Sequence, residues 1–345
     1  MNDIRIGIIG SGFMGKTHAE AIRRYVTGAR LVAIAGGSRA EQLARDYEVE
    51  ALPSIEALIT RADIDAVIIT TPHAQHAGEA IAAARHGKHV LVEKPMATTL
   101  TDCDAMIDAC RAAGVTLMVG QTQRFRVVNA TAKRLIDEGR IGRVLMMRET
   151  QMDTGGLAGL PAWQARPENL GLLLSHGVHN LDRMRWLAGD EPALVAARCG
   201  SFRQQTATEL SSMSLFTFRG GAVGSFWCEW ECPKPGFPHA GSSAWIMGEA
   251  GVLDLDAYGQ LRLGQGDAWT VVAEQPPIDW RGKGMLDAVR MEAYRNQNQE
   301  FIDSIRQRRR PAVAGEDGRA AVEMALAAYR SSATGQMVAF PLPRD

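Results

Sequence analysis

Short apolar runs alternate with longer helix-like segments along the first third of the chain. The unbroken apolar runs are residues 4–9, 31–35, 66–70, 89–92 and 116–119. The segments with helical spacing of apolar side chains are residues 16–25, 40–47, 74–86 and 100–113. Because strands covered on both faces read as continuous apolar runs, this pattern predicts strand-helix-strand units and a doubly wound parallel sheet.

The pattern changes after residue 123. A helix is expected over 130–138, then an extended run over 144–152, glycine-rich residues 155–159 and a further helix. From 193 to 272 polar and apolar residues alternate at period two, with hairpin signals such as Gly220-Gly221. Two helices are expected near the end, over 292–308 and 316–332. This half predicts an α+β domain with a large, open, mostly antiparallel sheet, so we expect two domains, residues 1–122 and 123–345.

Three glycines directly follow the first apolar run. Gly10, Gly12 and Gly15 form the pattern G-x-G-x-x-G where a strand ends and a helix opens. The first permits a tight turn, the second lets the backbone approach a pyrophosphate, and the third allows close helix-strand packing. The helix N-terminus adds N–H groups and a positive dipole. This context predicts a dinucleotide-binding Rossmann domain, and hence an α/β fold class.

The end of the second predicted strand bears on which dinucleotide is bound. An Asp or Glu there would accept hydrogen bonds from the adenosine ribose 2′-hydroxyl, but the sequence reads Ala35-Gly36-Gly37-Ser38-Arg39. Ser38 and Arg39 can instead donate to a 2′-phosphate. NADP(H) is therefore favoured over NAD(H), which stays possible. The alternative is that Arg39 is a solvated residue in the first turn of a helix.

Composition narrows the class of protein further. Of 345 residues 46% are hydrophobic, and the formal net charge is −1, which leaves no electrostatic footprint for nucleic acid or an anionic membrane. The basic run 308–310 follows a helical pattern and suits a helix C-terminus. Five cysteines without metal-site spacing predict reduced thiols and no metal site. Without a leader-like or membrane-spanning segment, we expect a cytoplasmic protein.

Further motifs give the chain a resemblance to a known family. They are Thr71-Pro72 followed by His76, Gly87-Lys88-His89-Val90 leading into Glu93-Lys94-Pro95, Gln123-Arg124-Phe125, Gly142 after Ile141, Trp163, Gly177-x-His179-x-x-Asp182, and Gly315-Glu316-Asp317-Gly318 before Tyr329-Arg330-Ser331. Together with the glycine pattern, they make the whole chain similar to the Gfo/Idh/MocA family, named for glucose-fructose oxidoreductase and inositol dehydrogenase.

Two residues are expected to be catalytic. Lys94 lies at the carboxyl edge of the predicted parallel sheet, where it can hydrogen-bond a substrate oxygen during hydride transfer. His179 can exchange a proton near neutral pH, and Asp182, three residues on, shares its helix face. The resemblance implies these same roles, with both groups acting on one substrate oxygen. The alternatives are a Lys94 that merely pairs with Glu93, and an Asp182 that only caps local structure.

The resemblance and the glycine pattern together supply the other site residues. We expect the cofactor to contact Gly10, Gly12, Phe13, Met14, Gly15, Ser38, Arg39, Thr71, Pro72, His76, Glu93, Lys94 and Gln123. We expect the substrate to contact Arg124, Gln151, Asp153, Trp163, Ser175, His176 and His179. Trp227, Trp230 and His239 are further candidates, although burial or a subunit interface explains each Trp equally well.

Ser175 departs from the family pattern. Many members carry an Asp there, which completes a set with the Lys and the His. With Ser, one negative charge that would favour protonation of His179 is missing. The departure leaves dehydrogenase chemistry possible but weakens the case for polyol recognition in the manner of inositol dehydrogenase.

The sequence therefore predicts an NADP(H)- or NAD(H)-dependent oxidoreductase. It would act on a secondary alcohol or carbonyl of a sugar, sugar acid or polyol, as a homodimer or homotetramer without nucleic-acid or membrane partners. One alternative is a glycosidase that oxidises its sugar transiently. Another is a dinucleotide-sensing regulator without activity, which would need neither Lys94 nor His179. Oxidation of aromatic dihydrodiols and reduction of imines also stay open.

Overall fold

The chain is divided into two compact units. The computed structural model describes residues 2–164, 166, 169, 171–238, 241–280 and 282–343. The first unit comprises Met1–Thr122 and Ile278–Arg319, and the second comprises Gln123–Pro277 and Ala320–Asp345. The sequence-based division placed everything after residue 122 in one domain. Residues 278–319 instead return to the first unit, because their helix packs against the first helix of the chain.

The first unit is built on a six-stranded parallel sheet. Its strand order is β3-β2-β1-β4-β5-β6, the doubly wound arrangement in which the order reverses beside β1. The strands are β1 (Ile4–Ile9), β2 (Ala29–Ala35), β3 (Glu50–Leu52), β4 (Ala66–Ile69), β5 (His89–Glu93) and β6 (Leu117–Gly120). All four residues of β4 are buried, as are Ile6, Ile8 and Ile9 of β1. The predicted parallel sheet is confirmed, and its carboxyl edge carries the residues that follow β1, β4 and β5.

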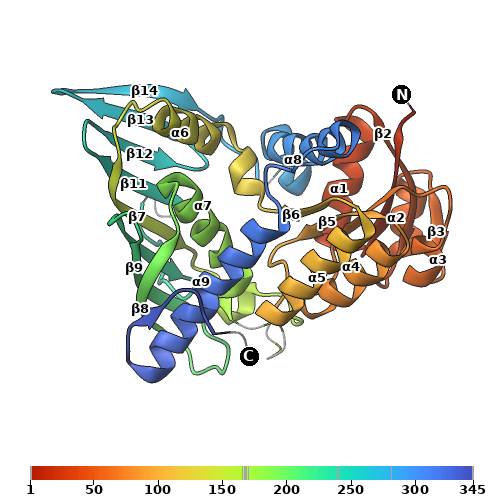
Figure 1. Ribbon diagram of the computed structural model, residues 1–345, viewed down its shortest axis with the longest axis horizontal. Coiled ribbons are helices and arrows are strands. Elements are labelled where there is room, and N and C mark those ends of the chain that lie inside the picture. Colours follow the sequence, from red (N-terminus) through yellow and green to blue (C-terminus); the bar gives the residue numbers. More distant parts are fainter. Residues whose placement is uncertain are drawn as a thin grey trace. The chain divides into compact units, whose positions relative to one another are not determined.

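Helices flank this sheet (Figure 1). They are α1 (Phe13–Arg24), α2 (Ala40–Asp46), α3 (Ile55–Ile59), α4 (His76–Arg85), α5 (Leu100–Ala113) and α8 (Ala288–Gln307). The four helices predicted in this region are present, and α5 has the predicted bounds. The sequence pattern missed β3 and α3, because three and five residues are too few to show a period.

The second unit is built on a nine-stranded sheet. Its order is β14-β13-β12-β11-β7-β10-β9-β8-β15, and every neighbouring pair is antiparallel except β7 and β10. The strands are β7 (Val144–Met152), β8 (Pro192–Gly200), β9 (Ser211–Phe218), β10 (Val223–Glu229), β11 (Ser243–Gly248), β12 (Val252–Asp256), β13 (Gln260–Gln265), β14 (Ala268–Glu274) and β15 (Val338–Ala339). The predicted open, mostly antiparallel sheet is confirmed.

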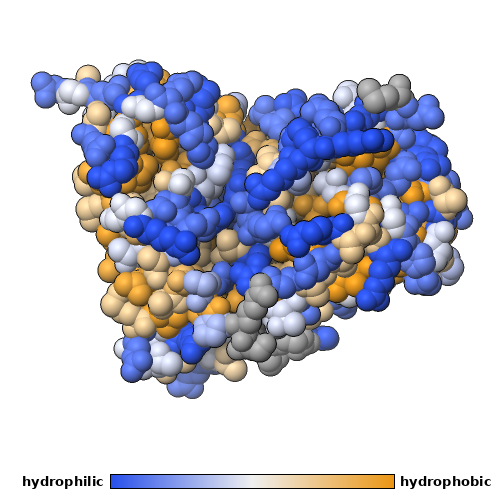
Figure 2. Space-filling view, viewed as in Figure 1, coloured by the Kyte–Doolittle hydropathy of each residue, from blue (hydrophilic) through white to orange (hydrophobic). Residues whose placement is uncertain are grey.

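One face of this sheet is covered by helices (Figure 1). Helix α6 (Val127–Asp137) packs on β12, β13 and β14, and α7 (Val178–Ala188) packs on β7 and β10. Burial alternates along the strands, so that Phe226 is buried in β10 whereas Met213 of β9 and Trp245 of β11 are exposed. Figure 2 shows hydrophobic surface over the strands of this unit. Helix α9 (Gly315–Thr334) begins in the first unit and continues in the second.

Among the described helices, none is both long enough and apolar enough to cross a lipid bilayer.

Candidate functional site

The turn between β1 and α1 has the geometry of a phosphate-binding turn. Gly10 adopts φ +105°, and a Cβ there would lie 2.7 Å from Thr70 Oγ1. A Cβ on Gly15 would lie only 2.2 Å from the carbonyl oxygen of Gly10, so only glycine lets α1 approach the turn this closely. At Gly12, just before α1, a Cβ would be 3.8 Å from Arg39 Nη2, an ordinary contact. The turn therefore fits the pyrophosphate of a dinucleotide, next to the N-terminus of α1.

The segment after β2 brings Arg39 over this turn. Gly36 and Gly37 both have positive φ, of 80° and 79°, and they reverse the chain so that the Arg39 N–H donates to Ser11 Oγ at 3.1 Å. Ser38 and Arg39 are exposed. None of the ion pairs among the described residues involves Arg39, so its guanidinium is available to an anion beside Gly12.

Two predicted cofactor residues lie in the first turn of α1. Phe13 is exposed, and the Arg290 guanidinium lies 4.8 Å from its ring centroid, a cation-π contact. Met14 is half-buried. Phe13 therefore presents an apolar surface beside the glycine turn.

The loop after β4 carries Thr71, Pro72 and His76. Thr71 Oγ1 donates to Glu79 Oε2 at 2.5 Å, and burial raises the pKa of Glu79 to about 7. Pro72 is half-buried. His76 is fully buried, with Nδ1 2.9 Å from the Pro95 oxygen and Nε2 2.8 Å from the Thr71 oxygen. Both ring nitrogens of His76 thus join the loops after β4 and β5.

Lys94 follows β5 at the carboxyl edge of the parallel sheet. Burial lowers the pKa of its amine, and the negative charge of Glu93 opposes this in part. Glu93 is buried, and its Oε2 accepts a hydrogen bond from the Lys94 backbone N–H at 3.2 Å. An amine with a lowered pKa is a stronger hydrogen-bond donor than an ordinary lysine, which suits it to polarising a substrate oxygen.

In the second unit, Ser175 and His176 lie on a π-helical turn, Leu173–Gly177, that leads directly into α7. Such turns often occur at functional sites. Ser175 is buried with its Oγ 2.9 Å from His176 Nδ1, and the His176 ring lies 4.6 Å from the Trp230 ring. His179 is half-buried in the first turn of α7. The turn therefore places the His176 imidazole against the Trp230 indole, which follows β10, while His179 comes two residues after the turn in α7.

Arg124 is held within the second unit by Asp182. Its Nε and Nη2 donate to the Asp182 carboxylate at 2.8 and 2.6 Å, and both side chains are buried. The guanidinium also lies 5.4 Å from the Trp186 ring centroid. A buried, bidentate pair of this kind fixes the start of α7, so Arg124 has a structural partner where a substrate contact was predicted.

The remaining predicted residues are spread over the second unit. Gln123 is buried, donates to Tyr258 Oη at 3.3 Å and accepts from Asn129 Nδ2 at 3.0 Å. Gln151 is half-buried on β7, and Trp163 is half-buried. Asp153 is exposed, and its Oδ1 caps a turn by accepting the N–H of Thr154 and of Gly155. The Trp227 ring lies 5.7 Å from the Phe237 ring and is tilted against it, and His239 lies outside the described residues.

Three side chains near the predicted groups escaped the sequence-based prediction. His18 contacts Glu93 Oε1, Glu79 contacts Thr71, and Glu209 Oε2 accepts from the Tyr329 hydroxyl at 3.0 Å. Burial raises the pKa of Glu209 to about 7. His18 follows the glycine pattern by three residues, which is the one local signal that pointed to it.

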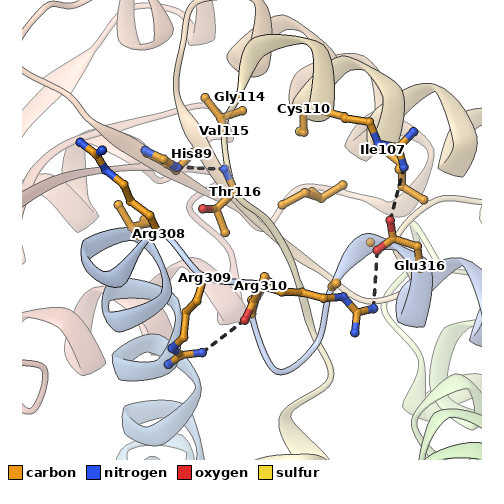
Figure 3. Close-up of a pocket in the computed structure, with 16 residues that line it drawn as sticks. His89, Ile107, Cys110, Gly114, Val115, Thr116, Arg308, Arg309, Arg310 and Glu316 are labelled. Carbon is orange, nitrogen blue, oxygen red and sulfur yellow. Dashed lines mark hydrogen bonds and ion pairs between the residues drawn. The ribbon is translucent and has the colours of Figure 1, made fainter.

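A separate cavity of about 710 Å³ lies where β5 and β6 begin, at the opposite edge of the parallel sheet from Lys94 (Figure 3). The basic run 308–310 lines it, and Arg308 caps the C-terminus of α8, as the sequence predicted for this run. Arg309 lies 2.6 Å from Glu300, and Arg310 lies 3.4 Å from Asp317. These pairs offset the positive charges of Arg309 and Arg310. In the described part of the chain, no group of three or more His, Cys, Asp or Glu is arranged to hold a metal ion.

Comparison with known proteins places this geometry in context. Residues 4–121 match the family model described as "Oxidoreductase family, NAD-binding Rossmann fold", and residues 129–254 match "GFO/IDH/MocA C-terminal domain". The inositol 2-dehydrogenase of Rhizobium meliloti is 29% identical over 342 residues, covering 97% of this chain and 98% of that protein. The solved structure of a levoglucosan dehydrogenase in complex with NADH and L-sorbose is 25% identical, with a TM-score of 0.86 and coverage of 99% and 100%.

Other relatives match over a shorter region. The 2,7-anhydro-N-acetylneuraminate hydratase of Mediterraneibacter gnavus is 31% identical over 205 residues, which is 59% of this chain and 54% of that protein. The chain thus aligns with about half the length of several of its curated relatives. Both halves of the chain nevertheless match models of one family, in the order and with the folds that the two units show. The chain therefore belongs to the Gfo/Idh/MocA family of oxidoreductases.

Proposed function

We propose that the protein is a nicotinamide-dependent dehydrogenase or reductase that acts on a secondary alcohol or carbonyl of a sugar, sugar acid or polyol. The observation that carries this proposal is the position of Lys94, which follows β5 at the same sheet edge as the glycine turn after β1. The pKa of its amine is also lowered. Inositol 2-dehydrogenase and levoglucosan dehydrogenase, both similar over nearly the whole chain, support the substrate class.

In the oxidative direction the substrate C–H bond breaks and its oxygen loses a proton. The bound dinucleotide would accept the hydride. Lys94 donates a hydrogen bond to the substrate oxygen and stabilises its growing negative charge. His179 takes the hydroxyl proton as general base, and the carbonyl product forms. Reduction follows the same steps in reverse, with His179 giving the proton back.

The test is turnover by variants that keep the cofactor. Lys94→Ala and His179→Ala should each lower kcat by about 100-fold or more, the usual range for losing a general acid-base group or an oxyanion donor. Lys283→Ala and His86→Ala, at exposed positions, serve as controls. Dinucleotide affinity by fluorescence should stay unchanged, and a sugar and polyol panel would be followed by nicotinamide absorbance. Unchanged turnover in both variants would refute the assignment.

We also propose that NADP(H) is the preferred dinucleotide. The support is Arg39, which lies over Gly12 without a described carboxylate partner, and a β2 end that carries no Asp or Glu. Arg39→Ala should weaken NADPH binding by about 10-fold or more, because a charge-assisted hydrogen bond is worth about 1.5–3 kcal/mol. NADH binding should change little, and Arg45→Ala, on the same helix, should affect neither. Tighter binding of NADH than of NADPH by the unmodified protein would contradict the preference.

A second candidate reaction is suggested by one relative's name. The similar Mediterraneibacter gnavus protein is a 2,7-anhydro-N-acetylneuraminate hydratase, so an anhydro-sugar or glycoside substrate fits the same family. A reaction of that kind, with transient oxidation by a tightly held cofactor, would form product without net reduction of added dinucleotide. Measuring product and reduced cofactor in the same assay separates the two candidates.

The exposed face of the nine-stranded sheet supports a homo-oligomer. Its exposed apolar side chains include Met146, Met213, Leu215, Trp245, Met247 and Trp269. An apolar face of this kind on a soluble domain indicates an interaction surface. We expect a homodimer or homotetramer in sedimentation experiments, and Trp245→Glu should shift the population toward monomer. A monomer at all concentrations would contradict this.

A further inference from the structure

A buried hydrogen-bonded chain links α8 and α1 to the residue before Lys94. His18 of α1 is fully buried, with Nε2 3.0 Å from Glu93 Oε1 and Nδ1 3.1 Å from Asn298 Oδ1. Asn298 of α8 is also fully buried, and the Tyr294 ring contacts the imidazole edge-to-face at 5.9 Å. All of these residues lie in the first unit. The imidazole is therefore enclosed by groups that fix its orientation.

The partners of this chain determine where its protons lie. Asn298 Nδ2 donates to the Tyr294 carbonyl oxygen at 2.7 Å, and a carbonyl can only accept, so the amide oxygen must face His18. His18 Nδ1 therefore carries a proton. On the other side, Nε2 faces a carboxylate oxygen of Glu93. An ionised Glu93 also only accepts, so Nε2 carries a proton too, and His18 is an imidazolium.

Glu93 itself has little freedom to move. Its Oε2 accepts the Lys94 backbone N–H, and on the neighbouring strand a Cβ at Gly120 would lie 3.1 Å from Glu93 Cδ. Burial pushes the pKa of Glu93 up, but the hydrogen bond and charge of His18, aided by Lys94, outweigh burial and keep the pKa below its usual value. The pair is thus an imidazolium and a carboxylate whose charges cancel.

We propose that His18 is a positioning residue for Lys94, held as an imidazolium between Glu93 and Asn298 so that it cancels the carboxylate charge beside the Lys94 amine. The inference rests on the proposed function, in which Lys94 contacts the substrate oxygen. It assigns a role to a fully buried histidine of α1. Asn298 supports the same task from a position 280 residues away.

The charge balance explains why the amine stays a strong donor. Without His18, the negative charge of Glu93 would act on the Lys94 amine uncompensated. The amine would then hold its proton more tightly, because opposite charges favour each other's ionised forms. Other charged or titratable groups also act near Glu93 and Lys94: the buried His76 imidazole interacts electrostatically with both, and the Arg290 guanidinium lies 4.6 Å from the Tyr294 ring centroid. His18 forms the described ion pair and hydrogen bond with Glu93 at 3.0 Å, so we assign it as the cation that compensates the carboxylate.

The first test reads the proton state of His18 in the intact protein. Protein labelled with ¹⁵N-histidine has eight imidazoles to resolve, and the His18 signal is identified by its shift in Asn298→Ala. We expect both His18 nitrogens to be protonated at pH 7, because each faces a hydrogen-bond acceptor. A neutral ring at pH 7 would overturn the proposal.

The second test reads the Lys94 amine without turnover. The rate of acetylation of Lys94 by acetic anhydride, located by peptide mass spectrometry, reports its titration as pH is varied. His18→Gln should move this titration up by about one pH unit, a tenfold loss of reactive amine at a given pH. The double variant His18→Gln with Glu93→Gln removes both charges and should return it toward the original value. An unshifted titration in His18→Gln, or no recovery in the double variant, would overturn the proposal.

These tests are independent of the proposed activity. His86→Gln, at an exposed histidine of the first unit, is the matched control and should leave the Lys94 titration unchanged. If Lys94→Ala keeps full activity while His18→Gln shifts the titration, the proposed function fails and the charge balance stands. If Lys94 is essential but its titration is unchanged in His18→Gln, the proposed function stands and this inference fails.

Discussion

Glu209 is the residue whose burial has the clearest consequence for stability. Its carboxyl pKa is raised to about 7, mainly by burial, while the N–H of Leu173 and the Tyr329 hydroxyl oppose the rise. The folded protein therefore binds this proton more tightly than the unfolded chain does. As a result, the contribution of this group to stability is complete below pH of about 4.3 and declines as pH rises towards 7.

Glu209→Gln removes this pH dependence. Between pH 5 and pH 8, the free energy of unfolding of the unmodified protein should fall by about 1–3 kcal/mol more than that of the Glu209→Gln variant. Urea denaturation at both pH values measures the difference. Glu41→Gln, at an exposed carboxyl, is the control and should show no such change. A constant difference between Glu209→Gln and the unmodified protein at the two pH values would contradict the raised pKa.

For single residues, the sequence predicted positions in the fold better than it predicted hydrogen-bond and ion-pair partners. The positions of Gly10, Gly12 and Gly15 in the turn before α1, and of Lys94 directly after β5, could be predicted because they follow from neighbours in the chain. The Glu93–His18–Asn298 chain could not, since its members are 75 and 280 residues apart. The pairing of Arg124 with Asp182 was equally invisible, because a motif does not show whether a charge finds a buried partner.

The glycine turn and α1 together decide how the first unit meets a dinucleotide. Gly12 and Gly15 have opposite surroundings in the same turn: a Cβ is tolerated at the first and collides with backbone at the second. Gly15→Ala should therefore lower the free energy of unfolding by about 2–4 kcal/mol, as backbone clashes do. Gly12→Ala should keep the stability within about 1 kcal/mol.

The same pair separates folding from binding. Gly12→Ala should weaken dinucleotide binding by about tenfold or more, because its methyl group occupies the space where a phosphate meets the N–H groups of α1. Denaturation and fluorescence titration of each variant provide the two measurements. Equal stability of the two variants would contradict the packing argument, and unchanged affinity in Gly12→Ala would contradict the phosphate site.

Elements long enough to show several repeats of their apolar pattern could be predicted. α5 and β7 have the predicted bounds, since each carries enough residues for its period to show. α1 begins at Phe13, three residues earlier than the pattern indicated, because the glycines of the turn interrupt the apolar spacing. The π-helical turn 173–177 had no sequence signal, since it depends on packing of Gly177 against Phe226 and Cys228 of the sheet.

Residues 278–319 return to the first unit after the chain has passed through most of the second. Helix α8 packs against α1, and Arg290 Nη1 donates to Thr17 Oγ1 at 3.3 Å across 273 residues of sequence. Local patterns cannot show such a return, because apolar spacing tells only that a helix has a buried face and not what covers it. A sequence-based division with one boundary at residue 122 therefore takes no account of residues 278–319, which group with the first unit.

This return makes a prediction about cooperative unfolding. If α8 unfolds together with the first unit, its amide hydrogens should exchange in the same opening event as those of β1, β4 and β5. Their exchange rates should then depend on urea concentration differently from the exchange rates of β9 and β10. Hydrogen exchange of the intact protein, followed by mass spectrometry across a urea series, measures this. Adding dinucleotide should slow exchange in α1 and α8 together, because a ligand that binds the folded form of a unit stabilises all of its cooperative elements. Exchange of α8 in step with β9 and β10 would instead place it with the second unit, and the buried His18–Asn298 contact would then contribute little to holding the dinucleotide-binding unit together.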